Sequence, residues 1–150
     1  MLIRITVLLV LAGFLTGCSM ESPGERFALK PAWTSPTPGT DPITSDIGTT
    51  IWVQAGPIIT AADIKSCEAI MDSAGRPAIK ITLNRSGAAR IKRFSSGHVN
   101  EPVAIFIDGQ LLSTPYVRAE MEGEFEINGF FEQAEVDQMV TSIREVMTSN

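Results

Sequence analysis

An apolar run near the N-terminus decides where folding can begin in this chain. The run extends from Ile5 to Leu15 and is interrupted only by one threonine and one glycine. Its length matches the core of a signal peptide and falls short of the roughly 20 residues that a membrane-spanning helix needs. Residues 1–17 are therefore predicted to be a signal peptide that takes no part in the fold.

The apolar run ends in Leu15-Thr16-Gly17-Cys18, which resembles the bacterial lipobox: an aliphatic residue, a small residue, Gly or Ala, then Cys. The resemblance implies cleavage between Gly17 and Cys18, diacylglycerol on the Cys18 thiol, and an acyl chain such as palmitate on its freed amine. Three chains exceed the two signals that stable membrane anchoring requires. An ordinary secretory signal followed by an accidental cysteine is the alternative. Ser19 stands where an Asp would favour the inner membrane, so the sequence slightly favours the periplasmic side of the outer membrane.

The segment after Cys18 is rich in proline, serine and threonine, with five prolines over residues 19–49. Such a composition buries little apolar surface and favours extended structure. It predicts a flexible tether over residues 18–49, able to reach roughly 90–100 Å. Phe27, Leu29 and Trp33 are the apolar exceptions. They are expected to contact the domain or nothing, or alternatively to form a short docking segment.

Composition excludes several classes of function for the remaining domain, residues 50–150. A formal net charge of −5 argues against a nucleic-acid partner. Two cysteines and one histidine in the whole chain leave no zinc-type ligand set. No nucleophile–base pair and no phosphate-binding loop are visible, so we expect no catalytic residues, no metal, no cofactor and no small-molecule substrate.

Apolar periodicity predicts three helices in the domain. Thr60 and Asp63 form a capping-box-like pair, and four apolar residues recur at helical spacing from Ile64 to Met71. Asn84 is expected to cap a second helix, and a third follows at residues 136–147, with Val136, Met139, Val140, Ile143, Val146 and Met147 as its apolar stripe.

Alternating residues predict strands at residues 51–53, 79–83, 103–107, 110–117 and 124–127. Asp108-Gly109 is a strong type I′ hairpin signal. The predicted order is β-α-β-α-β-β-β-α, in an α+β two-layer sandwich with helices on one face of a mostly antiparallel sheet.

Five segments of the domain, in order, resemble the head subdomain of the large periplasmic region of SecD, an accessory of the protein-export translocase. These segments are Pro57-Ile58-Ile59-Thr60-Ala61-Ala62-Asp63-Ile64, residues 79–94, Val103 to Pro115 with its Asp-Gly turn, Gly123 to Phe131, and the final helix. Thr114 and Ala61 depart from the usual family residues. The resemblance implies the fold and contact with exported or unfolded polypeptides or a translocase component. It implies no proton-driven motor, because the sequence after the domain contains no membrane helices.

Charge is distributed unevenly along the domain. Residues 76–93 hold six of the twelve basic residues and no acid, whereas residues 101–150 hold ten acids. Arg90, Lys92 and Arg93 are therefore candidate partner-binding residues on a helix face, with two solvated faces as the simpler reading.

Gln110 begins a predicted edge strand whose backbone is able to pair with an extended chain. The leading hypothesis is a lipid-anchored, non-catalytic binding module for polypeptides or an envelope complex. The alternative is a structural lipoprotein that docks on one fixed envelope partner through its charged faces. An enzyme is the least favoured hypothesis, because Cys67 is expected in the core and His98 in a surface loop.

Overall fold

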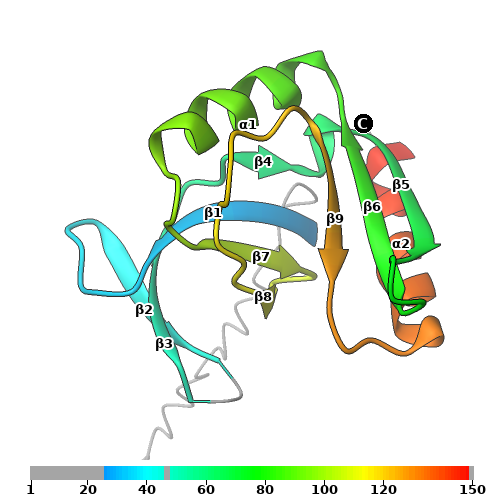
Figure 1. Cartoon of the computed structure of the whole chain (residues 1–150), viewed down its shortest axis with the longest axis horizontal. Helices are drawn as coiled ribbons and strands as arrows, with labels where there is room; N and C mark the ends of the chain where they lie inside the picture. The colour runs from blue at the N-terminus through cyan, green and yellow to red at the C-terminus, as the bar shows by residue number, and fades with distance from the viewer. Residues whose placement is uncertain (1–25, 46–47, 149–150) are drawn as a thin grey trace, which may run out of the picture.

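The computed structural model describes residues 26–45 and 48–148, which form an α+β domain with antiparallel sheets and two α-helices (Figure 1). The predicted α+β, mostly antiparallel class is confirmed. The elements are β1 Phe27–Trp33, β2 Thr40–Thr44, β3 Thr50–Gln54, β4 Ile59–Thr60, the 3-10 turn η2 Ala61–Asp63, β5 Ile64–Met71, β6 Pro77–Leu83, α1 Arg85–Gly97, β7 Val103–Ile107, β8 Gln110–Ser113, β9 Glu124–Asn128 and α2 Gln133–Thr148.

The strands divide between two sheets. The larger sheet has the order β2-β3-β1-β7-β8, with the short β4 also paired to β1, and the smaller sheet has the order β5-β6-β9. Every pairing is antiparallel. The first sheet therefore ends at β2 and at β8, and these two edges matter for the site below.

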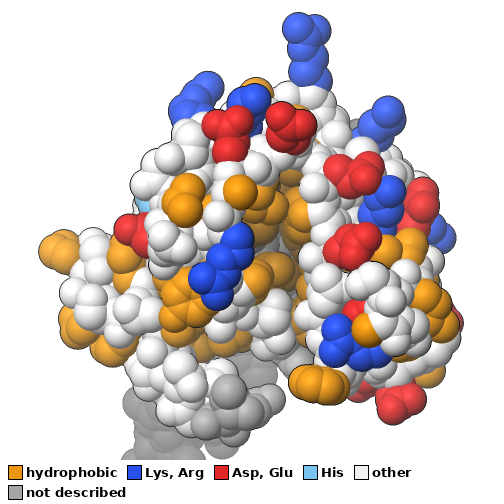
Figure 2. All heavy atoms as spheres, viewed as in Figure 1, with side chains coloured by type: hydrophobic (Ala, Val, Ile, Leu, Met, Phe, Trp, Pro, Cys, Tyr) orange, Lys and Arg blue, Asp and Glu red, His pale blue; other side chains and the backbone are white. Residues whose placement is uncertain are grey.

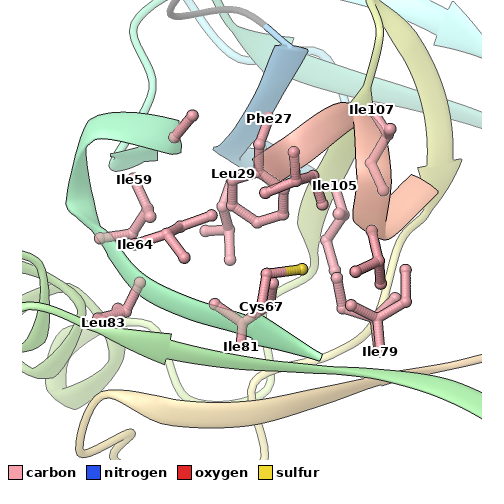
Figure 3. Packing of buried hydrophobic residues seen from close by; sticks show 14 of the residues in the cluster. Phe27, Leu29, Ile59, Ile64, Cys67, Ile79, Ile81, Leu83, Ile105 and Ile107 are labelled. Carbon is pink, nitrogen blue, oxygen red and sulfur yellow. The ribbon is translucent and has the colours of Figure 1, made fainter. Parts of the chain in front are cut away.

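The main core lies between the larger sheet and the layer made of the smaller sheet and α2. Phe27 and Leu29 from β1 and Ile105 from β7 meet Cys67 and Ile81 there (Figure 3). The predicted stripe of the last helix is confirmed, since Val136, Val140, Ile143 and Val146 are buried and Met139 and Met147 pack against the same cluster.

The tether prediction is wrong for residues 27–44, because β1 is a central strand of the larger sheet and β2 is its edge. Phe27 and Leu29 are fully buried core residues. Pro31 is tolerated in the middle of the sheet because it falls between the residues that pair with β4 and those that pair with β3. A missing N–H at that break costs no ladder hydrogen bond. Pro42 lies on the edge strand β2, where proline is also tolerated.

The predicted helix from residue 60 is also wrong, and a strand, β5, takes its place. The Thr60 N–H does donate to Asp63 Oδ2, at 2.9 Å, but the turn it opens ends at Asp63. A register shift between Ile64 and Ser66 then lets Ile64 and Cys67, three residues apart, both reach the core. The bulge thus gives the buried residues of β5 the spacing of a helix, although the strand pairs with β6 along its length.

Local signals in the middle of the domain are confirmed. Asn84 Oδ1 accepts from the Gly87 N–H at 2.9 Å and caps α1. Asp108 and Gly109 have φ values of 49° and 74°, as a type I′ turn between β7 and β8 requires. The return strand β8 ends at Ser113, short of the predicted Val117, ahead of Pro115.

Candidate functional site

The structure places the predicted partner-binding residues on two separate elements. Arg90, Lys92 and Arg93 lie on α1, and Gln110 opens β8 at an edge of the larger sheet. Gly17 and Cys18 lie outside the described residues, so the lipid-anchor prediction is carried forward as a proposal. Among the described residues, no helix has the length and apolar character to span a membrane.

Arg90 is occupied inside the fold. Its guanidinium pairs with Asp63 Oδ1, while the Thr60 N–H donates to Oδ2 of the same carboxylate. The Asp63 side chain is only 7% exposed. Gly87 permits this close approach of α1, because a Cβ there would lie 2.9 Å from Asp63 Cβ. Arg90 therefore fastens α1 to the η2 turn and is poorly placed to receive a partner.

Lys92 is also paired, although at the surface. Its Nζ lies 3.1 Å from Glu120 Oε1 and 3.9 Å from Glu122 Oε1. The hydrogen bond to Glu120 is the main reason that the pKa of Lys92 lies above its ordinary value. Beneath it, the buried Ser95 hydroxyl accepts from the Met121 N–H at 2.8 Å. These contacts hold the segment between β8 and β9 against α1.

Arg93 differs from the other two basic residues. It is exposed on α1, and the structure gives it no ion pair within residues 26–45 and 48–148. Arg85, the first residue of α1, is also exposed and has no ion pair within the same described residues. The basic surface that remains for a partner is thus Arg85 and Arg93, which is smaller than the sequence suggested.

The edge formed by β8 is the second surface. β8 pairs with β7 on one side, and no described strand pairs with its other side. A hollow of about 590 Å³ lies between β8 and the β2–β3 hairpin, and Ile43, Thr44, Gln110 and Leu111 are among its lining residues. A hollow of about 540 Å³ on the other side of β8 reaches Phe130 and Phe131. Phe130 is 98% exposed.

A third hollow of about 500 Å³ lies under the segment that joins β8 to β9. Leu29, Val103 and Ile105 contribute apolar side chains to it. Figure 2 shows hydrophobic side chains within this hollow and charged ones around its mouth. The rim includes a row of four glutamates at alternate positions, Glu120, Glu122, Glu124 and Glu126. Two of them are neutralised by neighbours, since Lys80 Nζ lies 2.9 Å from Glu124 Oε1 and Lys92 pairs with Glu120.

The remaining sequence candidates have structural roles. Cys67 is buried, and burial raises the pKa of its thiol to about 11. His98 stacks on Phe94, and its Nδ1 lies 2.8 Å from the Phe94 carbonyl oxygen. Within the described part of the chain, no three His, Cys, Asp or Glu side chains are grouped closely enough to hold a metal ion. The arrangement offers pairing and packing surfaces to a partner.

Sequence reasoning found β8 but missed its counterpart, β2. Residues 40–44 and 50–54 are two runs with β-branched residues separated by a short polar stretch, which is a hairpin signal. Because prolines surround residues 40–44, this run was instead predicted to belong to the tether.

Comparisons with known proteins agree with this geometry. Residues 39–146 match the family model described as SecDF, P1 head subdomain. Protein translocase subunit SecD of Rhodobacter capsulatus is 34% identical over 67 residues, covering 45% of this chain and 12% of that protein. SecD of Aquifex aeolicus is 26% identical over 92 residues, covering 61% of this chain and 18% of that protein. The chain thus spans less than a quarter of the length of these relatives.

Two solved structures share the fold. One is a SecDF structure, described as a membrane component that enhances protein export, with a TM-score of 0.60 and 19% identity over 79% of this chain and 63% of that chain. Another is SecDF in a super-membrane-facing form, with a TM-score of 0.61 and 19% identity over 78% of this chain and 18% of that chain. The matched family span contains every helix and strand from β2 to the last turns of α2. The chain belongs to the SecDF P1 head subdomain family.

Proposed function

We propose that this protein is a non-catalytic binding module of the protein-export apparatus, which contacts exported polypeptides or a translocase component on the periplasmic side of the envelope. Membership of the SecDF head family supports this role, since a SecDF structure with the same fold is described as enhancing protein export. The proposal covers binding alone, because the chain matches only a small part of its SecD relatives.

The unpaired edge of β8, flanked by hollows on both sides, is the observation that carries the proposal. Main-chain groups along a sheet edge pair with an extended polypeptide of almost any sequence, while neighbouring hollows accommodate its side chains. A surface of this kind suits a protein that meets many different exported chains.

A lipid on Cys18 is the proposed anchor, with Gly17–Cys18 as the cleavage site. Only eight residues, 19–26, separate Cys18 from the start of β1 at Phe27. Covalent geometry limits their reach to roughly 28 Å, which replaces the long tether expected from composition. The domain is therefore held close to the membrane surface. The choice of the outer membrane rests on Ser19 alone and is decided by membrane fractionation.

The anchor is tested by Cys18→Ala. We expect the variant to accumulate as a full-length precursor without incorporated lipid, whereas the parent protein is shortened and labelled by radioactive palmitate. Cys67→Ala is the matched control and is expected to be processed and labelled normally. Normal processing of Cys18→Ala would show an ordinary secretory signal instead.

Polypeptide binding is tested by photo-crosslinking in cells. A photoreactive residue replaces Gln110 at the β8 edge, Lys92 on α1, or Ser73, an exposed control position in the turn between β5 and β6. We expect Gln110 to give a ladder of products with many exported proteins and Ser73 to give none. Failure of Gln110 to capture any polypeptide while the variant is folded and anchored would refute the proposal.

A dedicated envelope partner is the second candidate, and the exposed, unpaired Arg85 and Arg93 favour it. It predicts one discrete product from Lys92 that weakens at high salt and is lost in Arg93→Glu. The same product surviving in Arg93→Glu would rule out docking through the basic surface.

A further inference from the structure

We propose that the hollow between β2 and β8 receives a short, extended, uncharged segment of polypeptide, which adds a strand to the β8 edge. The inference rests on the proposed polypeptide-binding function and assigns it a place, a mode of pairing and a substrate chemistry. Three features of the larger sheet lead to it: its curvature, the chemistry of its two edges, and its hydrogen-bond register.

Small side chains let the larger sheet curl around this hollow. On one face, β1 and β7 contribute Ala28, Ala32 and Ala104 to a second buried cluster that is separate from the main core. Ile43 of β2 and Leu111 of β8 both pack against that cluster, and both line the hollow. The first and last strands of the sheet therefore face a common space, as the bend of the β2–β3 pair in Figure 1 also indicates.

The two edges differ in how they are protected against pairing. Natural sheet edges are commonly blocked by charged residues or proline. β2 carries both, as Asp41 and Pro42. β8 reads Gln-Leu-Leu-Ser and carries neither. An unprotected, partly apolar edge promotes aggregation unless a partner covers it, so β8 is the edge that is built to pair.

The register identifies the groups that are free to pair. Gln110 lies opposite Ile107 next to the two-residue turn, and Leu111 lies opposite Phe106. Opposing residues in an antiparallel ladder alternate between hydrogen-bonded and non-hydrogen-bonded pairs. Gln110 and Ile107 form the pair that closes the turn, and the register shifts only after Leu111, where Ser113 lies opposite Ile105. Ahead of this bulge, the alternation directs the N–H and C=O of Leu111 to the open edge.

Strand direction favours a single guest strand. Successive antiparallel pairings from β2 through β3, β1 and β7 to β8 make β2 and β8 run in the same direction. A strand that enters antiparallel to β8 is then antiparallel to β2 as well. Since β8 has four residues, the pairing extends over roughly 13 Å.

The lining of the hollow selects an uncharged guest. The lining residues that the structure describes are all uncharged, and hydroxyl or amide groups from Thr44, Gln110, Ser113 and Thr114 stand beside the apolar Ile43 and Leu111. The other two hollows differ, since Asp108 and Glu135 line one and the glutamate row lines the other. A charge placed between Ile43 and Leu111 meets no opposite charge among the described lining residues and is costly to desolvate. The favoured guest alternates apolar and hydroxyl side chains.

The test uses the full chain, purified from membranes in detergent, and two fluorescent peptides. One has the core Thr-Val-Thr-Val-Thr between Gly-Lys ends, and the control has the core Thr-Asp-Thr-Asp-Thr. We expect the first to bind at least tenfold more tightly by fluorescence anisotropy, and to slow hydrogen exchange at the Leu111 amide. We expect Leu111→Pro, which removes the outward N–H, to weaken its binding at least tenfold, while Leu111→Val retains binding within a few fold.

Each outcome bears on the proposal. Exchange at the Leu111 amide is measured in the unaltered protein, so the test survives if Leu111→Pro folds poorly. Saturating peptide that leaves this amide unprotected overturns strand addition, while crosslinks from Gln110 in cells would still support polypeptide binding. If Gln110 captures no polypeptide and neither peptide binds, both the mode and the function fail. Concentration-dependent dimers that Leu111→Pro abolishes would identify a second copy of this chain as the occupant and would also overturn the inference.

Discussion

At the scale of single residues, Asp63 is a charged residue buried in the domain, with 5% of its surface exposed. Both of its oxygens have partners, Arg90 on Oδ1 and the Thr60 N–H on Oδ2. A carboxylate in this position is tolerated because it is paired, and removing one partner leaves an uncompensated charge. In the sequence Arg90 is one of several basic residues, and only the fold shows that it pairs with the Asp63 carboxylate.

We predict that Arg90→Ala lowers the free energy of unfolding by about 1–3 kcal/mol. The value lies below that of a fully buried pair, because the Arg90 side chain is 46% exposed and water screens the interaction. Urea unfolding followed by circular dichroism measures the effect. Arg93→Ala, on the same helix, is the control and should change stability by no more than about 0.5 kcal/mol. Equal effects of the two substitutions would contradict the structural role of Arg90.

Cys67 gives a prediction about pH. Burial raises the pKa of its thiol from about 9.0 to about 11, and nearby Arg144 opposes the rise in part. The folded state therefore holds the proton more tightly than the unfolded state. The stability contributed by the neutral thiol is complete below pH 9 and is lost as the pH rises through 11.

We expect the parent protein to lose its stability advantage over Cys67→Ala across pH 9–11. Urea unfolding of both proteins at several pH values measures the difference in their free energies of unfolding. The titration of lysines is common to both proteins and cancels from this difference. In a Cys18→Ser background, where Cys67 is the only cysteine, a disulfide reagent at pH 8 should label the thiol rapidly only after unfolding. Rapid labelling of the native protein would show that Cys67 is accessible.

At the scale of elements, the β7–β8 hairpin depends on one turn. Gly109 has a φ of 74°, a conformation that costs other residues about 1–2 kcal/mol. We predict that Gly109→Ala destabilises the domain by about that amount, and that it weakens crosslinking from position 110 because β8 is less well ordered. Gly97→Ala, at the end of α1 with open space around its Cβ position, should leave both properties unchanged. A stable Gly109→Ala variant with full crosslinking would show that the site does not depend on this turn.

The elements also show which parts of the fold are readable from sequence. The Asp108-Gly109 turn, the Asn84 cap and the apolar stripe of α2 depend on local chemistry, and all three are confirmed. β5 was misread because its bulge places Ile64 and Cys67 on one face at helical spacing. A bulge is set by pairing with β6, a contact that periodicity along one segment cannot reveal.

The candidate site was predictable to a similar extent. Gln110 follows from the turn signal, and an edge strand there follows from Pro115. The hollow beside it requires β2, which lies about 70 residues earlier in the chain and reaches β8 only because the intervening strands curl around Ala28, Ala32 and Ala104. Long-range curvature of this kind depends on how all five strands pack, so the binding space emerged only with the fold.

At the scale of the whole molecule, β1 joins the parts of the larger sheet. It lies between β3 and β7, pairs with both, and also with β4. Its Phe27 and Leu29 belong to the main core. A domain that begins at Thr50, as the sequence predicted, would lack this strand and leave the inner edge of β7 and the side chains of Ile105 and Ile107 uncovered.

We therefore predict that residues 26–150 unfold cooperatively in urea, whereas residues 50–150 are unfolded or aggregated. Loss of β1 removes two fully buried large side chains, each worth about 1.5–3 kcal/mol, together with the ladder to β7, and this approaches the 5–15 kcal/mol that stabilises a typical domain. Circular dichroism and sedimentation compare the two fragments. Adding a peptide of residues 26–45 should restore folded signal to the shorter fragment, since the missing strand pairs from outside the remaining chain. A cooperative transition of residues 50–150 alone would mean that the core between α2 and the smaller sheet is sufficient, and that β1 contributes little to the stability of the domain.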